Sequence, residues 1–491
     1  MSVLRGLSYW TGTASPASPD YDAVGQNRRT TNWNPTTGGP NTVSQFSNTD
    51  LVKRSRDAIR RNGWASAAVE THVSNIVGTG IVPRPHGAED FSQRVLELWS
   101  TWCKEADADN ALDFYGLQSL VARSRFEAGD VFVRYRNRRL EDGLLVPVQL
   151  QIMESEQCDI NYTELVSRNR QVVSGIEFDA IGRRTAYYFW SHHPGEFQNP
   201  NLSRIAVPAS EVSHIYRPLR PGQVRGVPDL AVALLTLYDL DEVRDARIMR
   251  EKIQNMLVGF LRKPAADMNP LGAGAPGTSS DSVPLASLEP ATIQELLPGE
   301  DITMSSPPSQ GAMADDFFRI HLQGVASSLG ITYEQLTGDL SNVNFSAIRA
   351  GLIEVRRRFE VMQSQIMVHQ FCRPVYSRFI EAAMISGALP VPIDFTARKN
   401  YYLSAEWHAD AFEFVQPVDD IEAIVKKIRA GLMSRDQAAA MLGYDVETID
   451  LQIQRDQERA EDLGIAFPDL QGGAANNPDA TDADGDGIIN E

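Results

Sequence analysis

The sequence has very little cysteine, and its cysteines follow no pattern that binds metal or builds a disulfide framework. Cys103, Cys158 and Cys372 are the only three in 491 residues, and they lie far apart. An odd number of cysteines without a C-x-x-C pair argues against a disulfide-stapled fold and against a zinc site that the sequence would reveal. We therefore expect the chain to fold in a reducing cytoplasm.

Long apolar runs and a secretory leader are also missing. Residues 1–6 contain no apolar leader, and no stretch approaches the ~18 uncharged apolar residues that span a bilayer. We expect neither a membrane span nor export by the secretory route.

Basic residues are outnumbered by acidic ones. The chain has 46 Lys plus Arg against 64 Asp plus Glu, a net charge of −18 and a pI near 5.0. Such a chain repels nucleic acid and anionic membranes, which argues against a tight DNA-binding module. Apolar and charged residues, at 42% and 22%, are as frequent as in ordinary globular proteins, and the length suits roughly two to four domains.

Motifs for catalysis and nucleotide binding are absent as well. The sequence has no G-x-x-x-x-G-K-[ST] loop, no G-x-S-x-G and no H-E-x-x-H, and its one G-x-G-x-x-G match, residues 272–277, lies among Pro and Ser residues and indicates a loop. His192 and His193 precede Pro194 and are typical of a turn. His72 lies on the apolar side of its helix and is typical of a buried or interface histidine. We predict that the chain is not an enzyme.

The hydrophobic periodicity predicts a chain of helices with one mostly β module. Residues 10–50 are rich in Thr, Ser, Asn, Pro and Gly, which predicts an arm over 1–47 that is loose or folds onto a neighbour. A helical pattern begins at about residue 48. A helix over 228–263 starts near Pro228 and alternates acidic with basic residues, which indicates support from neighbouring chains or domains. Antiparallel strands are predicted by β-branched and aromatic runs at 131–135, 146–153, 172–178, 186–190 and 212–216.

The C-terminal half begins with an insertion. Residues 264–312 are rich in Pro, Gly and Ser, helix resumes at 315–329, and a helix from Phe345 to Ile366 carries a heptad-like apolar stripe. Near the end, Ser434 opens a capping box within a small helical module, and the tail beyond it is acidic.

Two charged features leave alternatives open. Asp482, Asp484 and Asp486 have the spacing of an EF-hand-type calcium loop, but the glutamate of the twelfth position is missing. A weak or shared Ca²⁺ site and a solvated acidic tail both fit this pattern. The arginine-rich run 349–358 fits a solvated helix face paired with acidic neighbours, or a contact with phosphates or an adjacent subunit.

An ordered set of motifs resembles the lambda-type portal proteins of tailed bacteriophages. The pieces are Arg-Asn-Gly-Trp at 61–64 with His72, Ile-Val-Gly at 76–78, Glu-Ala-Gly-Asp at 127–130, Arg-Gly-Val-Pro at 225–228, Leu-Gly-Ile-Thr-Tyr-Glu-Gln-Leu-Thr at 329–337, and Asn-Phe-Ser-Ala-Ile-Arg at 344–349. The last two are the most specific, and the set covers roughly residues 50–460. The residues that carry the motifs include Gly226, Tyr333, Glu334, Leu336, Ser346 and Arg349.

The resemblance implies an α+β portal subunit with a mixed α/β wing, long stem helices, an inserted clip and a helical C-terminal module. It implies a ring of about twelve copies at one capsid vertex, assembled in the host cytoplasm, through which double-stranded DNA is packaged and ejected. The implied partners are the terminase large subunit, head completion and tail connector proteins, major capsid and scaffolding proteins. The DNA is not read by sequence, and neither a membrane, a catalytic residue nor a resident cofactor is implied.

The chain order usual in portals gives a division of this sequence. In that order, the loop after residue 338 is the candidate for the segment that faces DNA in the tunnel. Its residues are Asp339, Leu340, Ser341, Asn342, Val343 and Asn344. The divisions are an arm 1–47, a wing-like region 48–227, a stem-like helix 228–263, a clip-like insertion 264–312, a stem, tunnel-loop and wing region 313–418, a crown-like module 419–465 and a flexible tail 466–491.

Two other functions compete with this interpretation. One is another ring-forming head–tail connector or structural virion protein, and the other is a hydrolase built on His72, His192 or His193.

Overall fold

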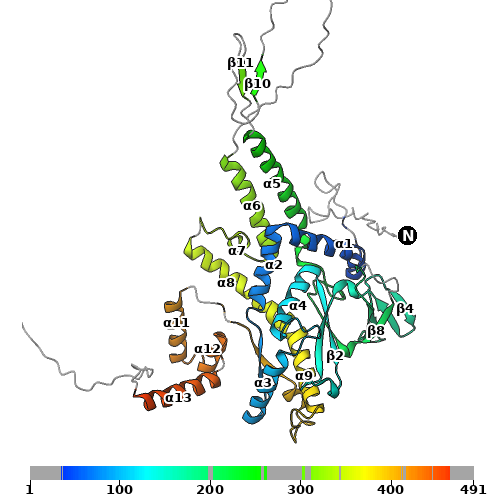
Figure 1. The fold of residues 1–491 in the computed structure, drawn as a ribbon, viewed down its shortest axis with the longest axis vertical. Coiled ribbons are helices and arrows are strands. Elements are labelled where there is room, and N and C mark those ends of the chain that lie inside the picture. The colour runs from blue at the N-terminus through cyan, green and yellow to red at the C-terminus, as the bar shows by residue number, and fades with distance from the viewer. Residues whose placement is uncertain are drawn as a thin grey trace, which may run out of the picture.

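A pair of long helices projects from a body of mixed helices and sheets in the computed structural model of the chain (Figure 1). None of the described helices is long and apolar enough to cross a membrane. The structure describes residues 35, 37–196, 203–255, 259–262, 301–304, 311–341, 344–410, 412, 416–444 and 446–464.

Helices lead into the body. Helix α1 begins at Pro40, inside the segment predicted as a loose arm, because Asn41 ties it to the body: its side chain donates to Gly222 O and accepts from the Val224 N–H. The elements of this part are α1 (Pro40–Arg61), α2 (Gly63–Ile76), β1 (Val82–Pro85), α3 (Glu89–Cys103) and α4 (Phe114–Ala128).

The mostly β module predicted from the strand runs between residues 131 and 216 consists of two antiparallel sheets. The first has the order β3-β2-β9, with β2 (Asp130–Asn137) between β3 (Val148–Glu154) and β9 (Val212–Tyr216). The second has the order β4-β5-β6-β7-β8. Its strands are β4 (Glu164–Ser167), β5 (Arg170–Val173), β6 (Ile176–Phe178), β7 (Arg184–Trp190) and β8 (Arg204–Pro208).

The single strand predicted over 172–178 is wrong. The chain turns between β5 and β6, with positive φ angles of 50° at Ser174 and 82° at Gly175. Two consecutive positive φ values are typical of a tight hairpin turn. The dipeptide Ser174-Gly175 interrupts the β-branched run and is a turn signal that the single-strand prediction overlooked.

The projecting pair consists of α5 (Leu234–Asn255) and α6 (Gly311–Leu329), which run side by side above the short turn η4 (Asp229–Val232). Helix α5 ends at Asn255 and not near Lys263 as predicted. Residues 259–262 instead form β10 (Gly259–Arg262), which pairs antiparallel with β11 (Asp301–Met304). Pairing with a segment distant in sequence thus overrides the local helical pattern.

After α6 the chain makes a long, nearly continuous helix. The short α7 (Tyr333–Thr337) precedes α8 (Phe345–Met362), and α8 continues through a π-helical stretch (Gln363–Cys372) into α9 (Arg373–Ile385). Beyond it, β12 (Ala405–His408) returns to pair with β1, a contact between segments more than 300 residues apart.

The C-terminal helices α11 (Pro417–Arg429), α12 (Arg435–Met441) and α13 (Val446–Leu463) follow α10 (Lys399–Tyr402). The predicted capping box at Ser434 is confirmed, since the Gln437 N–H donates to its hydroxyl and the Ser434 N–H to the Gln437 side chain.

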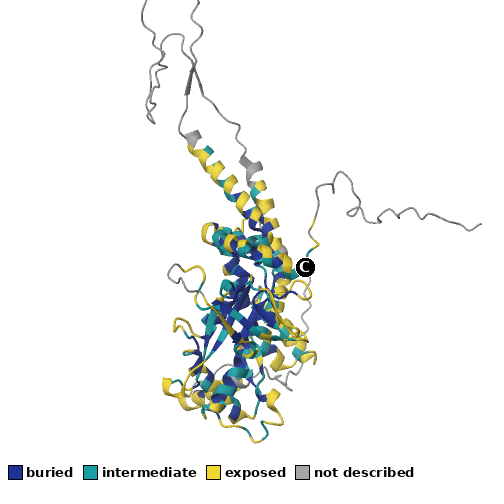
Figure 2. Ribbon diagram, turned by 90° about the vertical axis from the view of Figure 1, so that its right-hand side faces the viewer, coloured by how far each residue is buried: buried dark blue, intermediate teal, exposed yellow. Residues whose placement is uncertain are grey.

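The core lies where α3, α4, α9 and the first sheet meet, and Figure 2 shows buried residues concentrated in the body while the projecting helices are mostly exposed. Aromatic rings fill its centre. Trp99 contacts Phe114 and Phe379 with ring centroids 4.9 and 5.0 Å apart. The Trp102 indole N–H donates to Val148 O at 2.8 Å, so this buried ring keeps a hydrogen bond.

Two backbone segments cross with no room for side chains at Gly129 and Gly226. A Cβ on Gly226 would overlap the Gly129 carbonyl, and a Cβ on Gly129, whose φ is 88°, would overlap the Val227 backbone. Neither obstacle is a flexible side chain, so the crossing requires glycine at both positions.

Gly226→Ala is therefore expected to destabilise the protein by several kcal/mol, on the order of an overpacked core or strained backbone site. Gly324→Ala is the matched control, because Gly324 lies within α6 and its added Cβ would meet open space. That change should be neutral or stabilise by up to about 1 kcal/mol. Urea unfolding of both variants measures the difference, and equal midpoints would contradict a tight crossing.

Candidate functional site

Two of the sequence motifs meet at a buried ion pair. Asp130 and Arg225 are 0% and 1% exposed, and the Arg225 Nε–H donates to Asp130 Oδ2 at 2.6 Å. The Gly226 N–H donates to the same oxygen at 3.2 Å, and the Ser155 hydroxyl donates to the other. The carboxylate is thus surrounded by donors, which a buried charge requires.

The two terminal nitrogens of Arg225 also donate to three backbone carbonyls. Its Nη1 lies 3.2 Å from both Cys158 O and Ser174 O, and its Nη2 lies 2.8 Å from Ser155 O. Ser174 is in the β5–β6 turn of the second sheet, whereas Asp130 begins β2 of the first. One guanidinium therefore joins both sheets at the point where the chain leaves them for the projecting helices.

His214 completes this cluster as a neutral imidazole. Its Nε2 lies 3.3 Å from Asp130 Oδ2, and Arg184 Nη1 lies 3.3 Å from its Nδ1. The arginine donates to Nδ1, so the ring proton is on Nε2 and points to the carboxylate. Burial lowers the pKa of His214 to about 4. Burial alone would raise the pKa of Asp130, but Arg225 and His214 outweigh it and hold that pKa well below its usual range.

The motif at residues 61–64 holds the base of the projecting helices. The Asn62 side chain accepts from the Trp64 and Ala65 N–H groups at the start of α2, and it donates to Asp241 of α5 at 2.8 Å. Trp64 contacts both projecting helices. The centroid of its ring lies 5.5 Å from the Arg244 guanidinium of α5 and 6.4 Å from the centroid of the Phe318 ring of α6. This turn thus contacts both α5 and α6.

His72 is a buried histidine, as predicted. Its Nδ1 lies 2.8 Å from Ala68 O and its Nε2 lies 3.1 Å from Leu329 O, where α6 ends. The ring packs against Phe126 and Phe359 at 4.4 and 5.4 Å, and burial lowers its pKa. It links α2 to the motif that begins at Leu329.

The motif at 329–337 forms a capped turn, and the candidate loop for DNA follows it. Thr332 and Gln335 make a capping box that starts α7, Leu336 is 2% exposed, and the Glu334 carbonyl accepts from the Gly338 N–H. Gly338 ends the helix with a φ of 70°.

The described part of the loop is exposed and internally bonded. The Asp339 carboxylate accepts from the Ser341 N–H and hydroxyl at 3.0 and 2.6 Å and from the Tyr333 hydroxyl at 3.3 Å. The hydrogen bonds from Ser341 lower the pKa of Asp339. Leu340 is 65% exposed, Asn344 leads into α8, and Asn342 and Val343 lie outside the described residues.

The arginine-rich run begins with a pair to an acidic neighbour. Arg349 Nη2 lies 2.7 Å from Asp420 Oδ1, and Nη1 donates to the Gln416 side chain. The interpretation of this run as a paired helix face is therefore confirmed for Arg349, which ties α8 to the start of α11. Ser346 lies in the first turn of α8. Asp482, Asp484 and Asp486, the predicted calcium residues, and the loop 272–277 lie outside the described residues.

His193 belongs to an ion-pair network. Its Nε2 lies 2.9 Å from Glu154, and Arg56 contacts Glu154 at 3.2 Å and Glu156 at 2.6 Å. The Gly195 N–H donates to His193 Nδ1, so the neutral ring carries its proton on Nε2, where a metal would need a lone pair. Although these three groups lie close enough to hold an ion, Arg56 already pairs with both carboxylates and balances one of their two charges. His192 contacts Ser191 instead, in a bend as predicted.

Sequence reasoning did not identify Asp130, Arg225 and His214 as one cluster. The motifs contained Asp130 and Arg225, but 95 residues separate the two. The one available signal was a charged residue beside glycine in each motif.

Comparison with known proteins identifies the class. The family model described as phage portal protein, lambda family, matches residues 26–363, which is more than half of the chain. The chain belongs to this family of portal proteins.

Named relatives match over most of their length. A probable portal protein of Halomonas phage phiHAP-1 is 25% identical over 431 residues, which cover 85% of this chain and 82% of the relative. The portal protein of Escherichia phage N15 is 21% identical, covering 84% and 85% of the two chains. Portal protein B of Escherichia phage lambda is 20% identical, covering 89% and 88%.

Solved structures give weaker likenesses. A chain in the neck of a native gene transfer agent particle, computed with C12 symmetry, is 14% identical with a TM-score of 0.45, covering 82% of this chain and 98% of that one. A chain of the native particle's virion is 13% identical with a TM-score of 0.43, covering 84% and 96%.

The family establishes the role in outline. The chain is a portal protein of a phage virion, structural and not enzymatic, as the sequence resemblance implied. The hydrolase interpretation built on His72, His192 or His193 is set aside by this membership.

Acidification is expected to destabilise the protein through His214. The pKa of its imidazole is about 4 in the folded chain against an ordinary 6.5. Below pH 6.5 the unfolded chain binds a proton here that the folded chain does not bind until about pH 4. The free energy of unfolding therefore falls as the pH drops through this window, by at most about 1.4 kcal/mol per pH unit.

His214→Gln isolates this contribution, because glutamine keeps an N–H donor toward Asp130 and does not titrate. Urea unfolding at several pH values between 7.5 and 4 should show a shallower loss of stability for the variant than for the unmodified chain. His72 contributes equally to both. The same pH dependence in the two proteins would show that His214 is not the buried neutral group described here.

Proposed function

We propose that the chain assembles into a ring of about twelve copies at one capsid vertex, where it forms the passage for double-stranded DNA during packaging and ejection. Membership of the portal family supports this proposal. The observation that carries it is the projecting pair α5 and α6, whose exposed surface is rich in large apolar side chains: Leu235, Tyr238, Val243, Ile248 and Met249 on α5, and Phe317 and Ile320 on α6.

A lone subunit would leave these side chains in water. Leu235 and Ile320 are 74% and 65% exposed, and apolar surface of this extent is typical of a surface that another chain covers. In a closed ring each copy meets the next through the same pair of surfaces, so one set of side chains serves every contact. We infer that neighbouring copies cover the projecting helices.

Charge supports passage of DNA without binding. With a net charge of −18 per copy, a ring of such chains offers duplex DNA few sites of attachment. A basic channel would bind phosphates at many points and oppose movement along it.

The chain order supports an assignment of the parts. The two sheets belong to the wing, α5 and α6 to the stem, the insertion 264–312, which contains β11, to the clip, and α11 to α13 to the crown. The clip receives the terminase large subunit and, later, the head completion and tail connector proteins. Scaffolding and major capsid proteins meet the ring in the host cytoplasm, where the head assembles.

The loop that begins at Asp339 is the proposed contact with DNA in the tunnel. Deleting residues 339–343 is expected to leave ring assembly intact, because the capped helix α7 and Leu336 before it are held by the core. Packaging of DNA should be strongly impaired. A Gly-Ser segment of the same length is the control that separates loop length from side-chain chemistry.

Electron microscopy of the purified chains and complementation of a portal-defective phage provide the two measurements. Rings with a central hole from the unmodified chain support the proposal, and a uniform, folded monomer under assembly conditions would contradict it. Normal packaging by the deletion variant would rule out the tunnel assignment while leaving the ring in place.

A further inference from the structure

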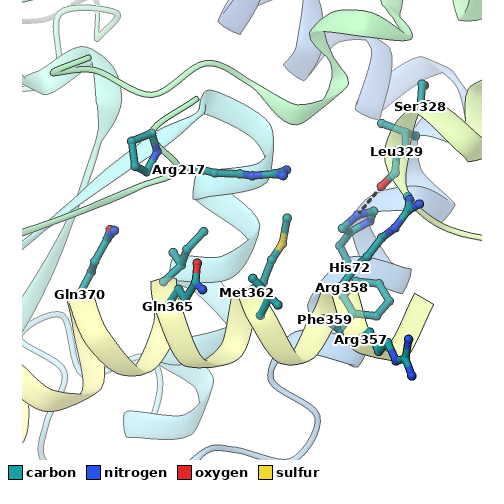
Figure 3. Close-up of a pocket in the computed structure, with 14 residues that line it drawn as sticks. His72, Arg217, Ser328, Leu329, Arg357, Arg358, Phe359, Met362, Gln365 and Gln370 are labelled. Carbon is teal, nitrogen blue, oxygen red and sulfur yellow. Dashed lines mark hydrogen bonds between the residues drawn. The ribbon is translucent and has the colours of Figure 1, made fainter. Parts of the chain in front are cut away.

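A pocket of about 620 Å³ lies between the α8 helix and the segment that follows β9. Figure 3 shows Arg217 reaching over the helix, with Met362, Gln365 and Gln370 directed toward the same side and Arg358 beside His72. Much of the lining is apolar: Leu329, Phe359, Val361, Met362 and Ile366.

The rim of this pocket is basic. Arg217, Arg357 and Arg358 line it, and none of its lining residues is acidic. Within the described part of the chain, Arg217 and Arg357 have no ion-pair partner. Arg358 has one, Glu354, at a long distance of 3.9 Å, and 54% of the Arg358 side chain is exposed. In a chain of net charge −18, three guanidinium groups around one hollow form a local site for anionic groups.

A buried arginine, Arg125, lies behind the pocket and is paired with Asp229, so the net positive charge of this region comes from the rim. Arg125 is 1% exposed, and one of its terminal nitrogens, Nη1, has no hydrogen-bond partner among the described residues. Its Nη2 donates to Asp229 at 2.7 Å and lies 3.9 Å from the sulfur of Met362, which lines the pocket.

The combination of an apolar lining with a basic rim selects the kind of ligand. Phosphates of a DNA backbone bind to exposed cations and gain nothing from the apolar lining residues, which we call the floor of the pocket. A peptide that carries both carboxylates and apolar side chains uses both features, through charge-assisted hydrogen bonds and through burial.

The chain itself contains such a peptide. Residues 465–491 include six acidic residues and no lysine or arginine. Two apolar residues, Ile488 and Ile489, come shortly after the acidic stretch 482–486. Residues 1–34, by contrast, include Arg5, Arg28 and Arg29 against two aspartates. Residues 465–478 connect Gly464 to the acidic segment 479–491. Fully extended at ~3.3 Å per residue, this connection spans up to roughly 45 Å.

We propose that the acidic segment 479–491 of this chain docks in the pocket, with its carboxylates on Arg217, Arg357 and Arg358 and Ile488-Ile489 on the apolar floor. The pocket lies beside His72 and Leu329, close to the start of the capped α7 turn. Docking there connects the C-terminal tail to the elements that precede the tunnel loop.

A crosslinking experiment on the full chain tests the proposal. A photo-crosslinking amino acid replaces Ile488, and EDTA keeps calcium away from the tail. Crosslinks are expected at residues 328–330 and 357–370, and high salt should lower their yield because exposed ion pairs are screened. Mixing heavy and light isotope-labelled chains distinguishes docking within one copy from docking between copies, and either result supports the proposal.

Matched variants make the test specific. Arg217→Gln, Arg357→Gln and Arg358→Gln together should lower the yield roughly tenfold or more, because charge-assisted contacts are lost. The control combines Arg60→Gln, Arg61→Gln and Arg429→Gln, which removes the same charge from exposed positions outside the pocket. This control should leave the yield unchanged.

A second variant excludes a trivial loss of folding. Asp482→Asn, Asp484→Asn and Asp486→Asn alter only the tail and should reduce the same crosslinks. Crosslinks at other sites, or a yield that neither triple variant lowers, would overturn the proposal. Protection of the pocket by duplex DNA in place of tail crosslinks would also overturn it and assign the pocket to DNA.

Discussion

The buried ion pair between Asp130 and Arg225 is the constraint on which the arrangement of this subunit depends. It forms where α4 passes into β2 and where the chain leaves β9 for η4 and the projecting helices, and Gly129 and Gly226 allow the two backbones to touch there. The same guanidinium binds carbonyls of the second sheet. Because removing one partner would leave an uncompensated charge in the core, the pair holds the two sheets and the start of the projecting helices together.

The projecting helices are then held from a second side by the turn between α1 and α2. Asn62 donates to Asp241 of α5, Trp64 lies between Arg244 and Phe318, and His72 reaches the end of α6 at Leu329. The motif residues therefore connect the body to the projecting helices, which suits the structural role of a portal protein. The capped α7 turn starts directly from this connection, so the position of the proposed tunnel loop depends on it.

Local patterns in the sequence were sufficient for elements whose signals are local. The β2 run around Val133, the capping box at Ser434 and the buried side of the helix at His72 follow from propensity, capping and periodicity, and the structure confirms them. Elements set by distant partners could not be predicted: β10 ends the helical pattern of α5 by pairing with β11, and β1 pairs with β12. The motifs contained Asp130 and Arg225, but only the fold shows that these charges neutralise each other.

A double-mutant cycle on this pair tests the central claim most directly. Urea unfolding of Asp130→Asn, Arg225→Met and the double variant gives three changes in the free energy of unfolding. If the pair anchors the fold, each single change should cost about 3 to 5 kcal/mol, and the double variant should cost well below their sum because no unpaired charge remains. Additive costs within about 0.5 kcal/mol would show that the two residues act independently and would contradict the account.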